Sequence, residues 1–472
     1  MTAAQQKNAR ITSLRWGTIP YTPGSGLHVG CGAQRTWPNA LGLDTGKLGP
    51  AVDLMMQLDE LPIFNSNVYD FVGVGDALAR VKQPRKLLAE CWRVLAPGGN
   101  LIITRPTAVA YEWLLQDADD YCVMANLQMG AYRVDVVQKL DPGAGVHRAA
   151  AVGDKTCAIV RTGGFGDAIW ASSLLPTLKE EGYHVTMYLE PQGEEVLRHD
   201  PNVDRIIVTD DLRVNGESLG PFWAHEMERY DRFINLVECV EKNMLAVPND
   251  LRFYWPADER RRVFGGNYLE AVHRLAGVPR KWAQRFFPTA DETREALGRV
   301  TAHRKTAVFA ISGSTLPKFW PYADELLQGL VQRGYDVWVM GDLRGCALTP
   351  RKGVHVVGLG WSIRQSLAFS LIADVVVGQE TGILNAVAFE PMRKVVLLSH
   401  STAKNLTAHW KNTIALHGTP ACWPCHQIHY LQNGWVHCNQ DETTKVAKCQ
   451  STISVDQVLA AVDQRHVVRV AA

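Results

Sequence analysis

At 472 residues the chain is too long for one compact core, and the usual size of a domain predicts three units of roughly 150 residues each. Its 49 basic residues nearly cancel its 48 acidic ones, so the net charge gives no argument for nucleic acid or a membrane surface as a partner. No apolar run approaches the ~18 residues that would span a bilayer, and the first residues lack the apolar core of a signal peptide. We therefore expect a cytoplasmic protein with no integral membrane association.

Short β-branched runs alternate with longer amphipathic segments along the chain, a pattern typical of parallel sheets covered by helices on both faces. The predicted strands fall into three groups. They lie at residues 27–29, 71–74 and 101–104, then at 157–160, 185–189, 205–208 and 233–237, and finally at 306–311, 336–340, 354–357, 374–377 and 394–398. We therefore predict an α/β fold of three Rossmann-like units, with polar or Gly/Pro-bearing joints at 141–154 and 289–305.

The first unit has a glycine turn after its first predicted strand and an acid at the end of its second. Gly30 and Gly32 follow residues 27–29, and Asp44 ends the run 41–44. Glycines let the backbone pass close to a ligand, and an acid at the end of the second strand can hold ribose hydroxyls. Alone, this pattern fits a cofactor loop and a plain structural turn equally well.

The residues that follow make the segment resemble a short class I S-adenosylmethionine-dependent methyltransferase over about residues 25–107. The stretches that carry the resemblance, in order, are Asp53-Leu, Gln57-Leu-Asp59-Glu-Leu-Pro, Val68-Tyr-Asp-Phe and Leu87-Leu-Ala-Glu-Cys-Trp-Arg-Val-Leu-Ala-Pro-Gly-Gly-Asn-Leu-Ile-Ile. The resemblance implies that Gly30 and Gly32 line the methionine end of the cofactor. It places Asp44 at the ribose and Asp59 at the adenine.

Two features depart from this family. Many relatives carry a His-x-Leu-Glu-His-like segment after the fourth strand, whereas this chain reads Asp76-Ala-Leu-Ala-Arg80 there and lacks those polar side chains. The customary closing strands are also hard to place after Pro106, although residues 131–140 can supply one. Two interpretations stay open: a cofactor-binding unit, with or without methyl transfer, and a degenerate unit kept for packing or for recognising the acceptor.

The second unit begins with a buried-strand pattern that ends in Arg161 and continues through a glycine-rich loop to Asp167 and a predicted helix. Such a loop places backbone N–H groups and strand-end side chains in the crevice where α/β folds bind ligands. The segment is similar to the signature of the ADP-heptose (lipopolysaccharide) heptosyltransferases, glycosyltransferase family 9. The resemblance implies that Asp167 is the general base on the acceptor hydroxyl, and the structural alternative is an N-cap for a helix at 168.

The third unit carries two further motifs of that family. Ser312-Gly313-Ser314 followed by Lys318-Phe-Trp-Pro resembles its Gly-Ser and Lys-x-Trp-Pro elements, and a lysine at a strand end can neutralise the charge of a diphosphate leaving group. The run from Ala373 to Ala388 resembles its Asp-Thr-Gly-x-x-His-x-Ala element, in which amides at a helix start bind the donor phosphates. The implied donor site comprises Gly313, Ser314, Lys318, Glu380, Thr381, Gly382 and Asn385.

Two of these residues differ from the family pattern. Glu380 stands where the family has Asp, and Asn385 stands where it often has His. Backbone amide contacts to the donor phosphates survive such changes. The hydrogen bonds that position the donor sugar can be altered by them. The identity of the donor sugar therefore stays open.

Four cysteines lie close together near the end of the chain, at 422, 425, 438 and 449. Cys422, Cys425, Cys438 and Cys449 could present four thiolates tetrahedrally to a structural zinc ion. The alternatives are reduced, partly buried thiols and one or two disulfides, and a cytoplasmic location disfavours disulfides.

The predicted organisation is a methyltransferase-like domain at 1–150, a GT-B acceptor domain at 155–300 and a GT-B nucleotide-sugar donor domain with the cysteine-rich tail at 301–472. The resemblance implies an inverting transfer from a nucleotide-diphosphate sugar to an acceptor hydroxyl, with no metal needed for the diphosphate. A bifunctional methyltransferase and glycosyltransferase, and a non-catalytic nucleotide-sugar binding protein, stay open as alternatives. The acceptor stays open among a saccharide, a lipid-linked glycan, a protein, a small molecule and a modified nucleobase.

Overall fold

The protein is described from a computed structural model of the whole chain. The residues that the structure describes are 11, 13–15, 17–46, 50–75, 77–106, 121–129, 131–139, 150, 153–208, 223–224, 226–248, 250–282, 284–313, 315–343, 346–358, 360–429 and 438–464. They gather into two compact units. The first comprises Met1–Ile159, Gly182–Glu194 and Pro201–Phe233, and the second comprises Val160–Glu181, Glu195–Asp200 and Ile234–Ala472.

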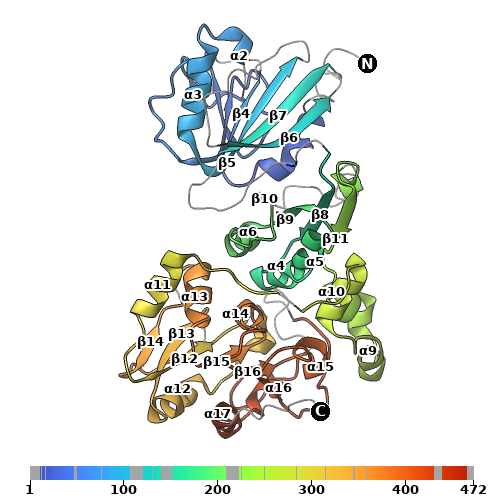
Figure 1. Cartoon of the computed structure of the whole chain (residues 1–472), viewed down its shortest axis with the longest axis vertical. Coiled ribbons are helices and arrows are strands. Elements are labelled where there is room, and N and C mark those ends of the chain that lie inside the picture. The colour runs from blue at the N-terminus through green and yellow to red at the C-terminus, as the bar shows by residue number, and fades with distance from the viewer. Residues whose placement is uncertain are drawn as a thin grey trace. The chain divides into compact units, whose positions relative to one another are not determined.

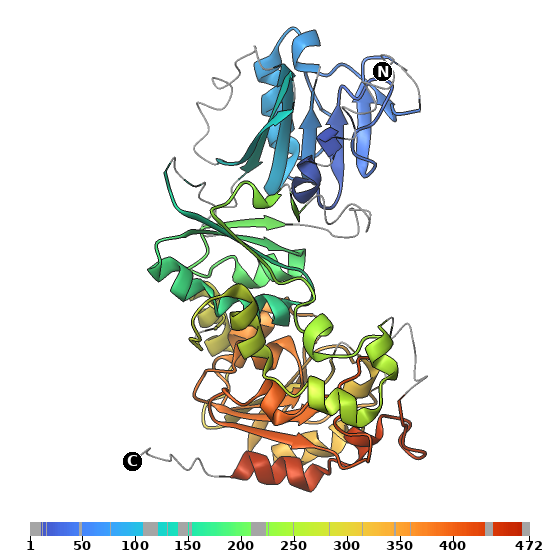
Figure 2. The same ribbon diagram turned by 90° about the vertical axis from the view of Figure 1, so that its right-hand side faces the viewer.

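Seven strands form the first sheet, in the order β3-β2-β1-β4-β5-β7-β6. They are the blue to teal arrows of Figure 2. Their bounds are β1 Gly26–Val29, β2 Ala40–Asp44, β3 Leu54–Met55, β4 Tyr69–Val74, β5 Leu95–Pro106, β6 Tyr121–Met129 and β7 Tyr132–Lys139. The strands from β3 to β5 are parallel, and β7 pairs antiparallel with both β5 and β6. Because β1 and β2 run in parallel, the glycine turn after β1 and the acid at the end of β2 lie at the same edge of the sheet.

Helices α2 (Ala77–Arg80) and α3 (Pro84–Val94) follow β4. Pro84 stands in the first turn of α3, where its missing N–H has no helical partner to lose. The helix buries one face, made of Leu87, Leu88, Cys91 and Val94. This face packs with the buried residues of β1, β4 and β5 into the hydrophobic core of the sheet.

Four strands form the second sheet, in the order β10-β9-β8-β11. Their bounds are β8 Thr156–Arg161, β9 His184–Leu189, β10 Arg205–Val208 and β11 Arg232–Asn235. The helices that follow these strands are α4 Phe165–Ser172, α5 Leu175–Glu180, α6 Pro191–Leu197, α8 Glu241–Met244, η4 Leu251–Tyr254, α9 Ala257–Val263 and α10 Tyr268–Ala276. The central position of β8 brings the loop after it beside the segment after β11.

Six parallel strands form the third sheet, in the order β14-β13-β12-β15-β16-β17. Their bounds are β12 Lys305–Ala310, β13 Tyr335–Met340, β14 Val354–Val356, β15 Val375–Gln379, β16 Arg393–Leu398 and β17 Thr413–His417. The accompanying helices are α11 Ala290–Gly298, η5 Leu316–Lys318, α12 Ala323–Gln332, α13 Ile363–Ser370, α14 Gly382–Ala386, α15 Ala403–Leu406, α16 Lys448–Ser451 and α17 Val455–Asp463. Helices α12 and α17 pack together and contribute to the core of this sheet, and α11 packs beside α13 (Figure 1).

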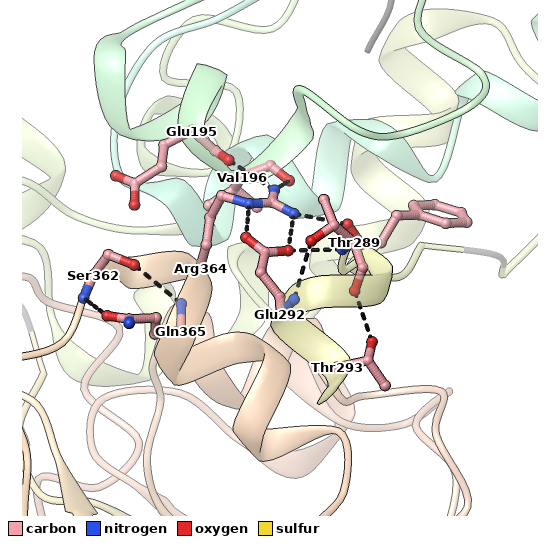
Figure 3. A network of polar contacts seen from close by, with 9 residues as sticks. Glu195, Val196, Thr289, Glu292, Thr293, Ser362, Arg364 and Gln365 are labelled. Carbon is pink, nitrogen blue, oxygen red and sulfur yellow. Dashed lines mark hydrogen bonds and ion pairs between the residues drawn. The ribbon is translucent and has the colours of Figure 1, made fainter. Parts of the chain in front are cut away.

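A buried arginine connects three segments of the second unit (Figure 3). The guanidinium of Arg364 in α13 donates two hydrogen bonds to the Glu292 carboxylate of α11, at 2.6 and 2.7 Å. It also donates to the backbone carbonyls of Glu195 and Phe287, each at 2.9 Å. Because only 7% of the Arg364 side chain is exposed, these bonds hold α13 to α11 and to the end of α6 from inside the fold.

The predicted α/β class, with three sheets dominated by parallel strands, is confirmed. The predicted domain boundaries stay a prediction. None of the described helices has the length and apolar character needed to cross a membrane.

Candidate active site

A cavity of about 530 Å³ lies in the second unit, lined by the loop after β8, the start of α8, the loop after β12 and the turn before α14. It gathers the residues predicted from the three glycosyltransferase motifs. Asp167, Gly313, Lys318, Glu380, Thr381, Gly382 and Asn385 all line it. The remaining predicted residue, Ser314, lies outside the described residues.

Asp167 lies in the first turn of α4, and its carboxylate accepts two hydrogen bonds. One comes from the backbone N–H of Gly164 at 3.0 Å, and the other comes from the Arg161 guanidinium at 2.7 Å. The expected helix start at 168 was wrong, because α4 begins at Phe165 with the extended Gly164 before it. Asp167 is therefore not the N-cap residue, but its carboxylate still satisfies an orphan amide at the helix start.

A second carboxylate shares the guanidinium of Arg161. Glu241, at the start of α8, accepts from the same Arg161 nitrogen at 3.1 Å and lines the same cavity. The Arg161 side chain is only 3% exposed, whereas Asp167 and Glu241 are 26% and 22% exposed. A buried cation thus holds two carboxylates at the cavity wall.

The surroundings of Asp167 change its proton affinity. Burial raises the pKa of this carboxyl, the Arg161 charge works against that effect, and the Glu241 charge adds to it, so that the pKa lies above its usual value. A carboxylate with a raised pKa is a stronger base toward a hydroxyl group near neutral pH.

Lys318 lies across the cavity, at the end of η5. Its ammonium group donates to the backbone carbonyl of Glu380 at 3.0 Å and lies 3.9 Å from the Glu380 carboxylate. The aliphatic stem passes over Gly313 so closely that a Cβ there would lie 2.4 Å from Lys318 Cδ. With a side chain only 12% exposed, Lys318 is a cavity residue and not an ordinary surface lysine.

The Glu380 carboxylate is engaged within the protein. It accepts hydrogen bonds from the backbone N–H of Ser399 at 2.8 Å and from the Ser399 hydroxyl at 3.1 Å. Burial raises the pKa of Glu380, and the nearby Lys318 charge opposes that effect. The carboxylate therefore holds the loop after β16 and the Lys318 ammonium in place.

Two threonine hydroxyls at this cavity lack a partner within the described part of the chain. The hydroxyl oxygens of Thr315 and Thr381 are buried and accept or donate no hydrogen bond there, and both residues line the cavity. Buried polar atoms without partners are rare in folded proteins. They mark positions where a bound molecule can supply the missing hydrogen bonds.

Helices α4 and α14 meet through two glycines beside this site. A Cβ at Gly166 would lie 2.9 Å from both Gly382 Cα and Asn385 Nδ2, and a Cβ at Gly382 would lie 2.2 Å from the Phe165 ring. Only glycine allows this close approach. It brings the Asp167 helix next to the Thr381-Gly382 turn.

The four clustered cysteines line one small cavity of about 40 Å³, together with His400. Burial raises the pKa of Cys425 to about 11 and of Cys438 to about 12. Among the described residues, no group of three or more His, Cys, Asp or Glu side chains is arranged to hold a metal ion. The structure thus brings Cys422, Cys425, Cys438 and Cys449 together as free thiols, and zinc binding stays a prediction.

A separate cavity of about 230 Å³ lies in the first unit and is lined by Gly30 and Gly32, as the glycine turn predicts. Asp44 lies under this turn, where it accepts a hydrogen bond from the Gly32 N–H at 2.9 Å and forms an ion pair with Arg80. The Asp59 carboxylate accepts from the backbone N–H of Gln83 at 3.3 Å. It does not belong to the residues that line the cavity.

Residues 27–103 match a family model described as a methyltransferase domain. This match confirms the methyltransferase-like segment predicted from its motifs. No curated protein sequence matches the chain.

Solved structures are similar to a larger part of the chain. A family 9 glycosyltransferase from Veillonella parvula is 15% identical, over 66% of this chain and 98% of its own, with a TM-score of 0.47. ADP-heptose lipopolysaccharide heptosyltransferase II from E. coli is 14% identical, over 65% of this chain and 97% of its own, with a TM-score of 0.46. An iron-containing dodecameric glycosyltransferase from enterotoxigenic E. coli is 15% identical, over 69% of this chain and 83% of its own, with a TM-score of 0.44. This likeness is distant, and the activity has to be argued from the residues of the cavity.

Proposed function

We propose that the second unit transfers a sugar from a nucleotide-diphosphate donor to an acceptor hydroxyl, with inversion at the anomeric carbon. The observation that carries this proposal is one cavity with a carboxylate of raised pKa, Asp167, on one wall and a lysine whose side chain is only 12% exposed, Lys318, on another. Its volume of about 530 Å³ lies within the roughly 300–1,000 Å³ of small-molecule sites.

The donor diphosphate binds at Lys318 and the Thr381-Gly382 turn in this proposal. Lys318 supplies the positive charge, and the unpartnered hydroxyls of Thr315 and Thr381 supply hydrogen bonds to phosphate oxygens. Gly313, the predicted Ser314 and Asn385 complete the donor site. Glu380 acts through Lys318, because its carboxylate is already bonded to Ser399.

The acceptor hydroxyl lies at Asp167. Its oxygen attacks the anomeric carbon while Asp167 takes the hydroxyl proton, and the bond from that carbon to the diphosphate oxygen breaks. The bonding electron pair leaves with the nucleoside diphosphate, and Lys318 neutralises the charge that develops there. A single displacement inverts the anomeric centre, and no metal takes part in these steps.

Arg161 and Glu241 are positioning residues for this base. Arg161 fixes the direction of the Asp167 carboxylate, and Glu241 takes up part of the Arg161 charge. Without Glu241, the full charge of the guanidinium would face Asp167 and weaken it as a base.

Release of nucleoside diphosphate from a panel of nucleotide sugars tests the proposal, with the Asp167→Asn protein as control. Turnover that depends on Asp167 supports an enzyme. Tight donor binding by the wild-type protein without any release from any donor, in the presence of a broad acceptor panel, would instead support the non-catalytic binding protein.

A further inference from the structure

The acid of the first unit that should hold the cofactor ribose is already fully hydrogen-bonded. Asp44 Oδ1 accepts from the backbone N–H of Thr45 at 2.8 Å and from Arg80 Nη1 at 3.1 Å. Asp44 Oδ2 accepts from the backbone N–H of Gly32 at 2.9 Å and from Arg80 Nη2 at 3.1 Å. A carboxylate has about four lone-pair positions. Four donors therefore use the capacity that two ribose hydroxyls would need.

Burial adds to this saturation. The Asp44 side chain is 0% exposed, so a ligand in the cavity cannot reach it without moving a neighbour. Two of its four hydrogen bonds are fixed, because the N–H groups of Gly32 and Thr45 belong to the backbone. Arg80 is the exception, since 42% of its side chain is exposed and it stands at the last position of α2.

The Arg80 guanidinium also lies against the glycine turn. Its Nη2 donates to the Gly30 carbonyl at 3.3 Å, and a Cβ at Gly30 would lie only 2.9 Å from that nitrogen. Arg80 lines the same cavity as Gly30 and Gly32. The side chain thus fills the space between the turn and the acid, where the nucleoside of S-adenosylmethionine would have to lie to bond Asp44.

We propose that Arg80 occupies the nucleoside position of the first unit and keeps it from binding S-adenosylmethionine. The residues present do not fit the cofactor, because the ribose acid is neutralised by an internal cation. The first unit retains the fold of a methyltransferase without its cofactor site. This proposal is independent of the glycosyl transfer proposed for the second unit.

The test is calorimetric titration of the full-length protein with S-adenosylhomocysteine and S-adenosylmethionine. We expect no binding by the wild-type protein up to about 1 mM ligand. Arg80→Ala and Arg80→Gln should each bind with a dissociation constant at least 10-fold below this concentration. Arg80→Gln removes the charge but keeps a polar side chain that can donate to Asp44 until a ligand replaces it, so it guards against loss of folding in Arg80→Ala. Arg85→Ala is the matched control, because Arg85 is an exposed arginine of α3 that does not line the cavity.

A second substitution tests whether the gained binding depends on the release of Asp44 from Arg80. Adding Asp44→Asn to Arg80→Gln should abolish the gained binding, while circular dichroism shows that the first unit stays folded. Micromolar binding by the wild-type protein would overturn the proposal, and so would a loss of affinity in Arg80→Ala, which would make Arg80 a cofactor ligand. If folded Arg80 variants also fail to bind either ligand, Arg80 is not what closes the site.

Discussion

Asp167→Asn is the substitution that tests the proposed base most directly. Asparagine keeps the size of the side chain and an oxygen that can accept from Gly164 or Arg161, so α4 should keep its start. The proton acceptor is lost. General-base catalysis contributes roughly 100- to 10,000-fold, so we expect the transfer rate to fall by about 100-fold or more, or about 2.7 kcal/mol in activation free energy. Donor affinity should hardly change.

Glu241→Gln tests how the neighbouring charges tune that base. The transfer rate should rise with pH as Asp167 loses its proton, because only the carboxylate can accept the hydroxyl proton. Glu241 raises the pKa of Asp167, so its neutralisation should lower that pKa. The acidic limb of the pH profile should then move to lower pH, and the maximal rate should fall by roughly 3- to 10-fold because the base is weaker.

The assay is the initial rate of nucleoside diphosphate release between about pH 4 and 9, with kcat and KM separated. Glu238→Gln is the matched control, because this glutamate lies three residues before Glu241 and is 52% exposed in a pair with Lys242. An unchanged rate in Asp167→Asn would refute the base. An acidic limb that stays in place in Glu241→Gln, or that moves equally in the control, would refute the coupling through Arg161.

Three further substitutions test the donor site, the fold and the tail. Lys318→Ala should lower both donor affinity and rate, more strongly at low salt; unchanged affinity by calorimetry would make Lys318 a packing residue. Arg364→Met should lower the free energy of unfolding by about 3 kcal/mol, as urea unfolding can measure, because it removes the cation from a carboxylate that is only 19% exposed and leaves it with the Thr289 N–H. Burial works to raise the pKa of Glu292, but the Arg364 hydrogen bonds outweigh it and hold that pKa below its usual value. The stabilisation by the Arg364–Glu292 pair is therefore complete above about pH 4.5, and it is lost as the pH falls through the lowered pKa. This pH dependence of stability should be absent from Arg364→Met. Cys425→Ser should reduce both zinc content and thermal stability if the tail binds about one zinc ion per chain; metal-free, fully reduced wild-type protein with the same melting temperature would contradict a metal site.

The sequence could predict the sheet strands and the three strand-end motifs of the glycosyltransferase units because both depend on local patterns. Buried runs of β-branched residues marked the parallel strands, and the edge β3, the antiparallel β6 and the last strand β17 were missed. The loop after 157–160 belongs to another sheet, and its place at the same cavity does not follow from local patterns. Parallel strands of one sheet end at a common edge, so the residues after 306–311 and 374–377, which follow neighbouring strands, converge. Their convergence needed no knowledge of side-chain contacts.

The residues that sequence reasoning missed depend on contacts between distant segments. Glu241 lies 80 positions from Arg161, and its role follows from the place of β11 beside β8 in the sheet. A carboxylate shortly after the predicted strand at 233–237 was the available signal. Arg80 was noted only as part of a segment that lacks the usual polar residues, because nothing local shows that it reaches Asp44.

The two larger cavities differ in whether their polar atoms already have partners. At the cavity of the second unit, the hydroxyls of Thr315 and Thr381 are buried without a partner in the described part of the chain. Such atoms cost about 1–3 kcal/mol each when nothing bonds them, so a ligand that supplies the bonds gains that energy on binding. At the cavity of the first unit, Asp44 is satisfied by Arg80 and the backbone, and a nucleoside would first have to break the ion pair between Arg80 and this buried carboxylate. The same physical criterion therefore favours ligand binding at the second unit and opposes cofactor binding at the first.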